Sequence, residues 1–375
     1  MCLIVLCRTA CALACGLLAL PALHAASPLE PASAASAPAH HRSEGFQNNH
    51  LEFQPKTVLD WLQWRWQAAR QGLPRPPAKP IATVAPDLPF IGSNAIAGAA
   101  MQPAVTWIGH ASVLVQMAGL NILTDPIFSE RASPVTWAGP QRAQAPGVAS
   151  ADLPHIDLVM ISHNHYDHCD EASLRTLNRQ RGGAPVFLVP LGMKAWLADI
   201  NITNVVELDW WQSYQLGAAE FVLTPVQHWS GRSLTDRMHV LWGGYAVFAP
   251  DLHMFFAGDT GYSRDFSDIA ARFAERQRAA GGFDIALIPV GSYEPRWFMA
   301  QQHVDPSEAV RIHLDLRAKR SMGIHWGTFE LTDEPLDQPP LDLAVARRNF
   351  GVTEGDFFLL AIGQTRKLPR RSGAQ

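Results

Sequence analysis

Cysteine is scarce in the part of this chain that can form a folded domain. Four of the five cysteines lie within the first 15 residues, and beyond them only Cys169 remains. If residues 1–25 are removed, no internal disulfide can form. The fold must then be held by its hydrophobic core, by bound metal or by both, although an exported chain is normally free to use disulfides.

Charges and long apolar runs are also sparse. Charged residues make up 17% of the 375 residues and the formal net charge is −4, so without basic blocks the chain offers no broad electrostatic surface for nucleic acid. Residues 9–29 form an uncharged apolar run longer than the about 18 residues that a membrane span needs, whereas the longer uncharged stretch at 88–124 is interrupted by Gly, Pro and polar residues, so a protein with several spans is not expected. Hydrophobic residues are abundant, at 47%, and suffice for the core of one large α/β domain.

The N-terminus indicates export. Residues 1–25 carry one early charge, Arg8, followed by an uncharged run of Ala, Leu and Cys that ends in small residues. This pattern is typical of a secretory signal peptide, and an uncleaved N-terminal anchor is the alternative. We therefore expect a periplasmic or extracellular protein, with peripheral membrane association left open.

Three further segments follow. Residues 26–45 are rich in Ala, Pro and Ser and predict a flexible linker, in which His40 and His41 are solvated. Residues 46–366 are expected to form a single catalytic domain. Residues 367–375 are expected to be a frayed polar tail.

Short apolar strands alternate with helices through the domain. Strands are expected at 105–108, 113–116, 121–124, 158–161, 186–189, 221–224, 240–248, 254–257 and 285–289, with a tight turn at 117–119. Helices are expected at 170–180, 263–280, 306–318 and 341–350, the third with Asp305 as its N-cap. Antiparallel strands followed by strand–helix units indicate an α/β fold in which sheets are covered by helices.

The strongest chemical signal is Ser162-His163-Asn164-His165-Tyr166-Asp167-His168, which directly follows an apolar strand. Four metal-ligating side chains within six residues are poorly explained by packing, because buried imidazoles and carboxylates need partners. Imidazole together with carboxylate suits zinc, and also iron or manganese.

Three later positions follow the same pattern. Apolar runs lead directly into His228, Asp259 and His325. Each alone has an ordinary explanation as a partly buried histidine, a turn aspartate or a core residue. If the strand ends converge, however, five histidines and two aspartates meet at one sheet edge, enough for two metal ions.

These motifs together resemble the metallo-β-lactamase-fold hydrolases. More narrowly, the chain resembles the branch of N-acyl-phosphatidylethanolamine-hydrolysing phospholipases D, through segments spread from about residue 51 to 362. The most specific of these segments are Tyr293-Glu-Pro-Arg-Trp-Phe-Met299 and Ile324-His-Trp-Gly-Thr-Phe329; others are Thr106-Trp-Ile-Gly-His-Ala111 and Leu123-Thr-Asp-Pro-Ile-Phe128.

The resemblance implies an αβ/βα four-layer sandwich with a binuclear zinc site, iron or manganese being less expected. By motif, one zinc ion would be held by His163, His165 and His228. The second would be held by Asp167, His168 and His325, with Asp259 bridging both.

The resemblance also implies a reaction. A water attacks the phosphorus of N-acyl-phosphatidylethanolamine and releases phosphatidate and an N-acylethanolamine. The residues expected to be catalytic are Asp167, Asp259 and His303, and those expected to contact the substrate are Tyr166, Gln302, His303 and Arg296. The alternative is a hydrolase of the same fold that acts on another phosphodiester or a lactone.

Two other classes fit less well. A di-iron electron-transfer protein usually has a carboxylate where this chain has His165, and a non-catalytic scaffold would lack ligands. The partners expected are a phospholipid substrate and a membrane surface, with a homodimer left open and no nucleic acid.

The segment from Val58 to Trp66 contains three tryptophans and predicts a helix. Leu59, Leu62 and Trp66 share one helical face, while Trp61 and Trp64 lie off it. With basic residues nearby, this composition fits a helix at a membrane interface, or alternatively one docked on the domain with half-buried tryptophans.

Overall fold

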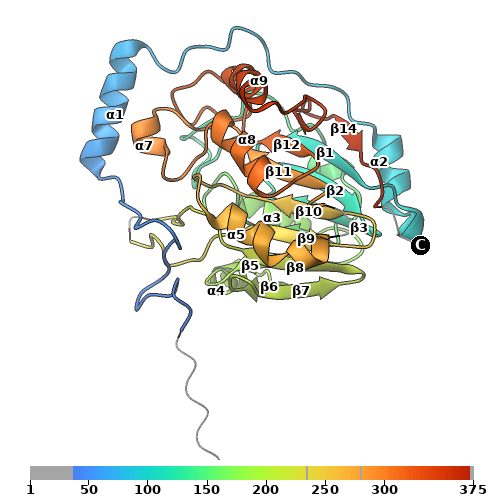
Figure 1. Ribbon diagram of the computed structural model, residues 1–375. Coiled ribbons are helices and arrows are strands. Elements are labelled where there is room, and N and C mark those ends of the chain that lie inside the picture. Colours follow the sequence, from blue (N-terminus) through green and yellow to red (C-terminus); the bar gives the residue numbers. More distant parts are fainter. Residues whose placement is uncertain (1–36, 234, 279–280, 372–375) are drawn as a thin grey trace, which may run out of the picture. The chain divides into compact units, whose positions relative to one another are not determined.

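The computed structural model describes residues 37–233, 235–278 and 281–371 (Figure 1). The predicted leader at 1–25 and most of the predicted linker lie outside these residues. Within the described ranges, no helix combines the length and the hydrophobicity needed to cross a bilayer.

Strands in the first half of the chain, joined by one from its C-terminal end, form a mixed sheet of seven strands in the order β14-β1-β2-β3-β4-β5-β6. In chain order the strands are β1 (Ala104–Gly109), β2 (Ser112–Met117), β3 (Leu120–Thr124), β4 (Leu158–Met160), β5 (Val186–Pro190), β6 (Val205–Leu208) and β14 (Thr365–Lys367). Strand β2 is antiparallel to β1 and β3, and β3 to β6 are parallel. Strands β1, β3, β4, β5 and β6 therefore end at the same edge.

A second mixed sheet has the order β13-β12-β11-β10-β9-β8-β7. Its strands are β7 (Ser213–Leu216), β8 (Ala219–Thr224), β9 (Gly244–Phe248), β10 (His253–Phe256), β11 (Ile285–Pro289), β12 (Ser321–Ile324) and β13 (Phe357–Phe358). Strand β9 is antiparallel to β8 and β10, while β10 to β13 are parallel. Strands β8, β10, β11 and β12 thus also share one terminal edge.

Helices cover the outer faces of the sheets (Figure 1). Against the first sheet lie α2 (Leu88–Ala95), α3 (Glu171–Asn178) and α4 (Lys194–Asp199), and against the second lie α5 (Asp265–Arg272), α8 (Pro306–Asp315) and α9 (Gln338–Phe350). The remaining α-helices are α1 (Val58–Gln71), α6 (Ala274–Gln277) and α7 (Arg296–Met299), and two 3₁₀ turns are η1 (Gly98–Ala100) and η2 (Ser150–Asp152). This arrangement confirms the predicted αβ/βα sandwich.

Local sequence signals act as expected at two points. The β2–β3 hairpin turns at Ala118 and Gly119, both with positive φ (53° and 77°), as a two-residue hairpin turn requires. Helix α8 begins with a capping box in which Asp305 and Glu308 satisfy each other's backbone N–H groups.

Two predicted boundaries are wrong. The helix expected at 263–280 is interrupted at Phe273, where α5 ends and α6 begins. The expected frayed tail is ordered up to Arg371: β14 pairs with β1, Leu368 is buried, and Arg371 Nη1 lies 2.8 Å from Asp284 Oδ2. All three residues of this edge strand are polar, and this concealed the pairing in the sequence.

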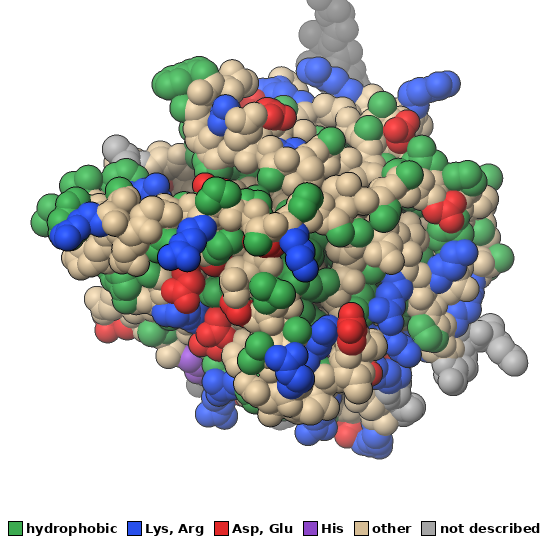
Figure 2. Space-filling model, turned by 90° about the horizontal axis from the view of Figure 1, so that it is seen from above, with side chains coloured by type: hydrophobic (Ala, Val, Ile, Leu, Met, Phe, Trp, Pro, Cys, Tyr) green, Lys and Arg blue, Asp and Glu red, His purple; other side chains and the backbone are tan. Residues whose placement is uncertain are grey.

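Helix α1 packs on the domain through the face opposite to its apolar stripe of Leu59, Leu62 and Trp66. Trp64 and Ala68 are buried against Phe298 and Met299 of α7. Leu59, Leu62, Trp61 and Trp66, by contrast, are between 49% and 76% exposed. The apolar stripe of α1 therefore faces outward, where hydrophobic and basic side chains lie together at the left of the view from above (Figure 2).

From composition we predicted that His40 and His41 are solvated linker side chains, and this prediction is wrong. Both rings contact Asp209, which directly follows β6, and His40 is buried. The folded unit already begins at Ala39.

The packing of the core between the sheets and helices lets us predict how much stability is lost when a buried side chain is shortened. Phe255 is fully buried and packs on Phe266 and Phe283. We expect Phe255→Ala to lower the free energy of unfolding by about 3–5 kcal/mol, measured by urea denaturation. Phe350→Ala at the 40% exposed end of α9 is the control. Equal losses in both variants would contradict the assignment of the core.

Candidate metal centre

The seven predicted metal ligands converge at the shared edge of the two sheets. The loop after β4 carries the four ligands from His163 to His168. His228, Asp259 and His325 follow β8, β10 and β12, which end at the same edge. The topology thus brings together side chains up to 162 positions apart in the chain.

One group of imidazoles consists of His163, His165 and His228. His165 Nδ1 lies 2.8 Å from His163 Nε2 and 3.4 Å from His228 Nε2. The three nitrogen atoms are close enough to share one metal ion. This is the first predicted ligand set.

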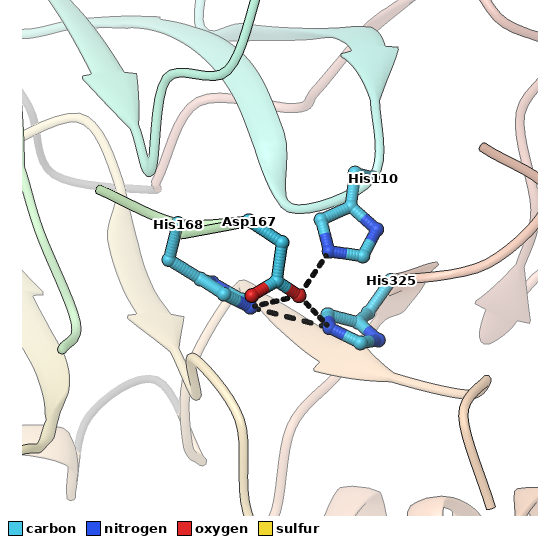
Figure 3. A group of neighbouring side chains, drawn as sticks. All are labelled: His110, Asp167, His168 and His325. Carbon is cyan, nitrogen blue, oxygen red and sulfur yellow. Dashed lines mark hydrogen bonds and ion pairs between the residues drawn. The ribbon is translucent and has the colours of Figure 1, made fainter. Parts of the chain in front are cut away.

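A second group consists of Asp167, His168 and His325 (Figure 3). Asp167 Oδ2 lies 3.3 Å from His168 Nε2 and 3.4 Å from His325 Nε2, and the two imidazole nitrogens are 3.2 Å apart. His110, at the end of β1, contacts the same Asp167 oxygen at 2.9 Å. The second predicted set therefore has an additional neighbour.

Asp259 lies between the two groups. Its Oδ2 is 4.0 Å from the Nε2 atoms of His163 and His228. The same oxygen is 3.0 Å from His168 Nε2, while Oδ1 is 3.2 Å from His325 Nε2. This position fits a carboxylate that serves both groups.

Oxygen atoms outside the two groups fix the orientation of three imidazole rings. The Nδ1 atoms are held by Ser162 Oγ for His163 (2.9 Å), by Asp125 Oδ2 for His168 (2.7 Å) and by the Gln302 carbonyl for His228 (2.9 Å). With Nδ1 held in this way, each ring turns its Nε2 toward the centre. Such outer contacts also raise the basicity of a metal-ligating histidine.

Burial and mutual repulsion control protonation. Burial lowers the pKa of His165 to about 4 and of His228 to about 3, so both imidazoles are neutral at pH 7. Burial alone would raise the pKa of Asp259, but His168 and His325 outweigh it and hold that pKa well below its usual range. Neutral imidazoles and ionised carboxylates are the forms that bind metal.

The residues present fit divalent metal ions. Asp259 Oδ1 is buried without a hydrogen-bond partner in the protein. Leaving such an atom unsatisfied is costly, and a cation satisfies several lone pairs at once. The two groups, with Asp259 between them, would therefore hold two ions.

Three residues of the centre were not predicted from the sequence. His110 and Asp125 follow β1 and β3 just as the predicted ligands follow their strands, and both have positive φ (54° and 32°). The Asn48 side chain forms two hydrogen bonds with the backbone of His228: it accepts from the N–H at 3.0 Å and donates to the carbonyl at 2.9 Å. A search for every polar residue at a strand end would have found the first two, but no local pattern marks Asn48.

The four residues predicted to contact the substrate differ in where their side chains lie relative to the metal ligands. His303 faces the metal ligands, with Nδ1 3.8 Å from Asp259 Oδ2. Gln302 contributes its carbonyl to His228, while its side chain turns toward Met299. The remaining two bind neighbouring loops: Tyr166 donates to the Arg232 carbonyl, and Arg296 donates to the carbonyl of His303 and to Glu308.

Comparisons with known proteins agree with this fold. The family model of the beta-lactamase superfamily domain matches residues 120–326. The chain is 40% identical over 235 residues to N-acyl-phosphatidylethanolamine-hydrolyzing phospholipase D 1 of Caenorhabditis elegans, covering 60% of this chain and 64% of that protein. It is 37% identical over 240 residues to the mitochondrial enzyme of the same name in Saccharomyces cerevisiae, covering 62% and 49%. The chain thus spans less than two thirds of either relative.

Among solved structures, the isothiocyanate hydrolase from Delia radicum gut bacteria is similar, with a TM-score of 0.55 and 20% identity over 71% of this chain and 99% of that one. At this identity the likeness concerns the fold alone.

The Asp125–His168 contact predicts a measurable effect on metal affinity. In Asp125→Asn the amide no longer accepts a charge-assisted hydrogen bond from His168, so affinity should fall by about 10–100-fold. Competition with a chromophoric chelator measures this loss. Asp251→Asn is the control, because Asp251 is also buried but accepts from the Ala118 N–H. Unchanged affinity in Asp125→Asn would contradict the orienting role.

Proposed function

Because the chain belongs to the beta-lactamase superfamily and is a metallo-hydrolase of that fold, we propose that it is a zinc-dependent phospholipase D that hydrolyses N-acyl-phosphatidylethanolamine. The observation that carries this proposal is the convergence of the two ligand groups on Asp259. The names of the two relatives supply the substrate and the reaction.

The overall reaction adds one water across a phosphodiester bond. The water oxygen bonds to phosphorus, the bond from phosphorus to the ethanolamine oxygen breaks, and that oxygen leaves as the hydroxyl of an N-acylethanolamine. When bound, two zinc ions would supply Lewis-acid chemistry, making water more acidic and stabilising negative charge on the phosphate. Asp167, which faces His168 and His325, remains ionised and can orient the attacking water.

His303 is the protein group best placed to contact the phosphate. It is 13% exposed in its side chain and faces Asp259 and His228. Burial lowers the pKa of His303 to about 3, so the neutral ring serves as a hydrogen-bond donor and not as a cation. Arg296 supports this position through the His303 carbonyl at 2.8 Å, and we assign it a positioning role.

A membrane surface is the proposed partner, in line with an exported, lipid-hydrolysing protein. Leu59, Leu62 and Trp66 on α1 are 76%, 50% and 59% exposed. The Arg70 guanidinium lies 4.7 Å from the Trp66 ring and provides positive charge beside this apolar surface. An amphipathic helix of this kind binds an interface through buried apolar area and attraction to anionic lipids.

One observation favours the alternative of a smaller, polar phosphodiester. A cavity of about 520 Å³ opens beside Tyr166, and six of the residues that line it are charged. They are Glu130, Arg131, Asp170, Glu171, Arg175 and Arg232. Such a wall suits a polar headgroup better than an acyl chain.

Removal of metal or of one ligand tests the proposed chemistry. Chelation should abolish hydrolysis of N-acyl-phosphatidylethanolamine, and added Zn²⁺ should restore it. His165→Ala should lower kcat/KM by at least about 100-fold, since loss of a ligand exceeds the 10–100-fold typical of an outer contact. His155→Ala is the control, because that exposed ring hydrogen-bonds to the Arg181 carbonyl and to none of the predicted ligands. Turnover of soluble phosphodiesters alone would instead support the alternative substrate.

Binding to lipid vesicles tests the partner. The triple variant Leu59→Ala, Leu62→Ala and Trp66→Ala should bind vesicles of phosphatidylethanolamine and phosphatidylglycerol at least about tenfold more weakly, since each side chain contributes about 1.5–3 kcal/mol when fully buried. Cosedimentation measures the binding. The control replaces three exposed residues of α9 with alanine: Leu341, Val345 and Phe350. Equal binding by both variants would rule out α1 as the docking helix.

A further inference from the structure

A second cluster of metal-ligating side chains lies apart from the centre described above. His40 Nε2 is 2.6 Å from Asp209 Oδ1, and His41 Nε2 is 2.8 Å from Asp209 Oδ2. The three donor atoms lie close enough together to hold one ion. The cluster shares no residue with the predicted metal centre.

The surroundings hold these side chains in place. The His40 ring stacks on Trp210 with centroids 4.4 Å apart, and the His41 ring meets Phe46 edge to face at 5.1 Å. The chain turns between the two histidines and Phe46, where the Gln47 N–H donates to the His40 carbonyl and His41 pairs with Phe46. The ligand atoms are therefore preorganised by backbone and aromatic contacts.

We propose that His40, His41 and Asp209 form an additional binding site for a zinc-type divalent cation. Two imidazole nitrogens and one carboxylate are three ligands of the kind that such ions take in proteins. The His41 side chain is 28% exposed, whereas those of His40 and Asp209 are 8% and 10% exposed. Solvent therefore reaches the cluster from the His41 side, where water completes a tetrahedral set.

The chemistry of ion entry is simple. At present both Nε2 atoms donate hydrogen bonds to the carboxylate. An ion at about 2.0–2.2 Å from each ligand takes the place of the two Nε2 protons, each of which moves to Nδ1 of its own ring, and the contacts between the ligand atoms widen. Asp209 is well suited because its hydrogen bonds from His40 and His41 outweigh the effect of burial and lower its pKa.

The site would connect the N-terminal segment to the metal centre. Asp209 lies at the end of β6, on the edge where the predicted ligands also lie. Eight residues after His40, Asn48 binds both backbone groups of His228. An ion between His40, His41 and Asp209 thus anchors the segment that positions a ligand of the predicted catalytic site.

Counting bound metal tests the proposal. The full-length chain is stripped of metal, dialysed against Zn²⁺ alone and analysed by mass spectrometry. The double variant His40→Ala, His41→Ala should bind about one ion per chain fewer than the unsubstituted protein, because two of three ligands are lost. The matched control, His50→Ala with His155→Ala, also removes two imidazoles from the part of the surface that the structure describes, and it should retain that ion.

The same count in the His165→Ala background separates this site from the proposed function. The additional ion should persist there even if the predicted catalytic site loses metal and activity. If the double variant does not fold, as judged by circular dichroism, the single variant His41→Ala should still show incomplete occupancy of one ion. Equal metal content in the unsubstituted and histidine-substituted proteins would overturn the proposal and leave a clamp of hydrogen bonds only.

Discussion

The burial of carboxylates and imidazoles at the common edge of the two sheets is the constraint on which the rest of the structure depends. Asp259, His163 and His228 are almost inaccessible to solvent, yet their polar atoms point toward one another. Polar groups in such a place are stable only with complementary charge. Divalent cations would provide it, and this would account for the potential ligands at so many strand ends.

The arrangement around this edge has its own cost. His110, Asp125 and His325 all adopt positive φ, a conformation that costs a residue with a side chain of order 1–3 kcal/mol. Each is held there by a contact that the site needs: His110 and His325 face Asp167, and Asp125 holds Ser162 and His168. Backbone strain and hydrogen bonds are thus concentrated at the centre, while the sheets behind it are regular and apolar.

Much of this could be predicted from the sequence because one rule repeats. An apolar run that stops at His or Asp marks a strand end, and parallel strands bring such ends together. The rule failed where the signal was not local. Strand β14 is polar, the exposed face of α1 is its more apolar face, and the contacts of His40 depend on Asp209, 169 positions away. Composition alone could not distinguish a linker from a segment that packs on the sheet edge.

The N-terminal segment that carries His40, His41 and Asn48 is part of the folded domain and supports its metal centre. His228 receives support from Gln302 on one side and from Asn48 on the other, so its position depends on both halves of the folded chain. Asn48 in turn lies close to the turn that presents His40 and His41 to Asp209. Because a ligand is only as rigid as the groups that orient it, the N-terminal segment belongs to the functional unit as much as the strands do. In this chain, the stretch rich in Ala, Pro and Ser thus contains two histidines whose partner, Asp209, lies on the fold.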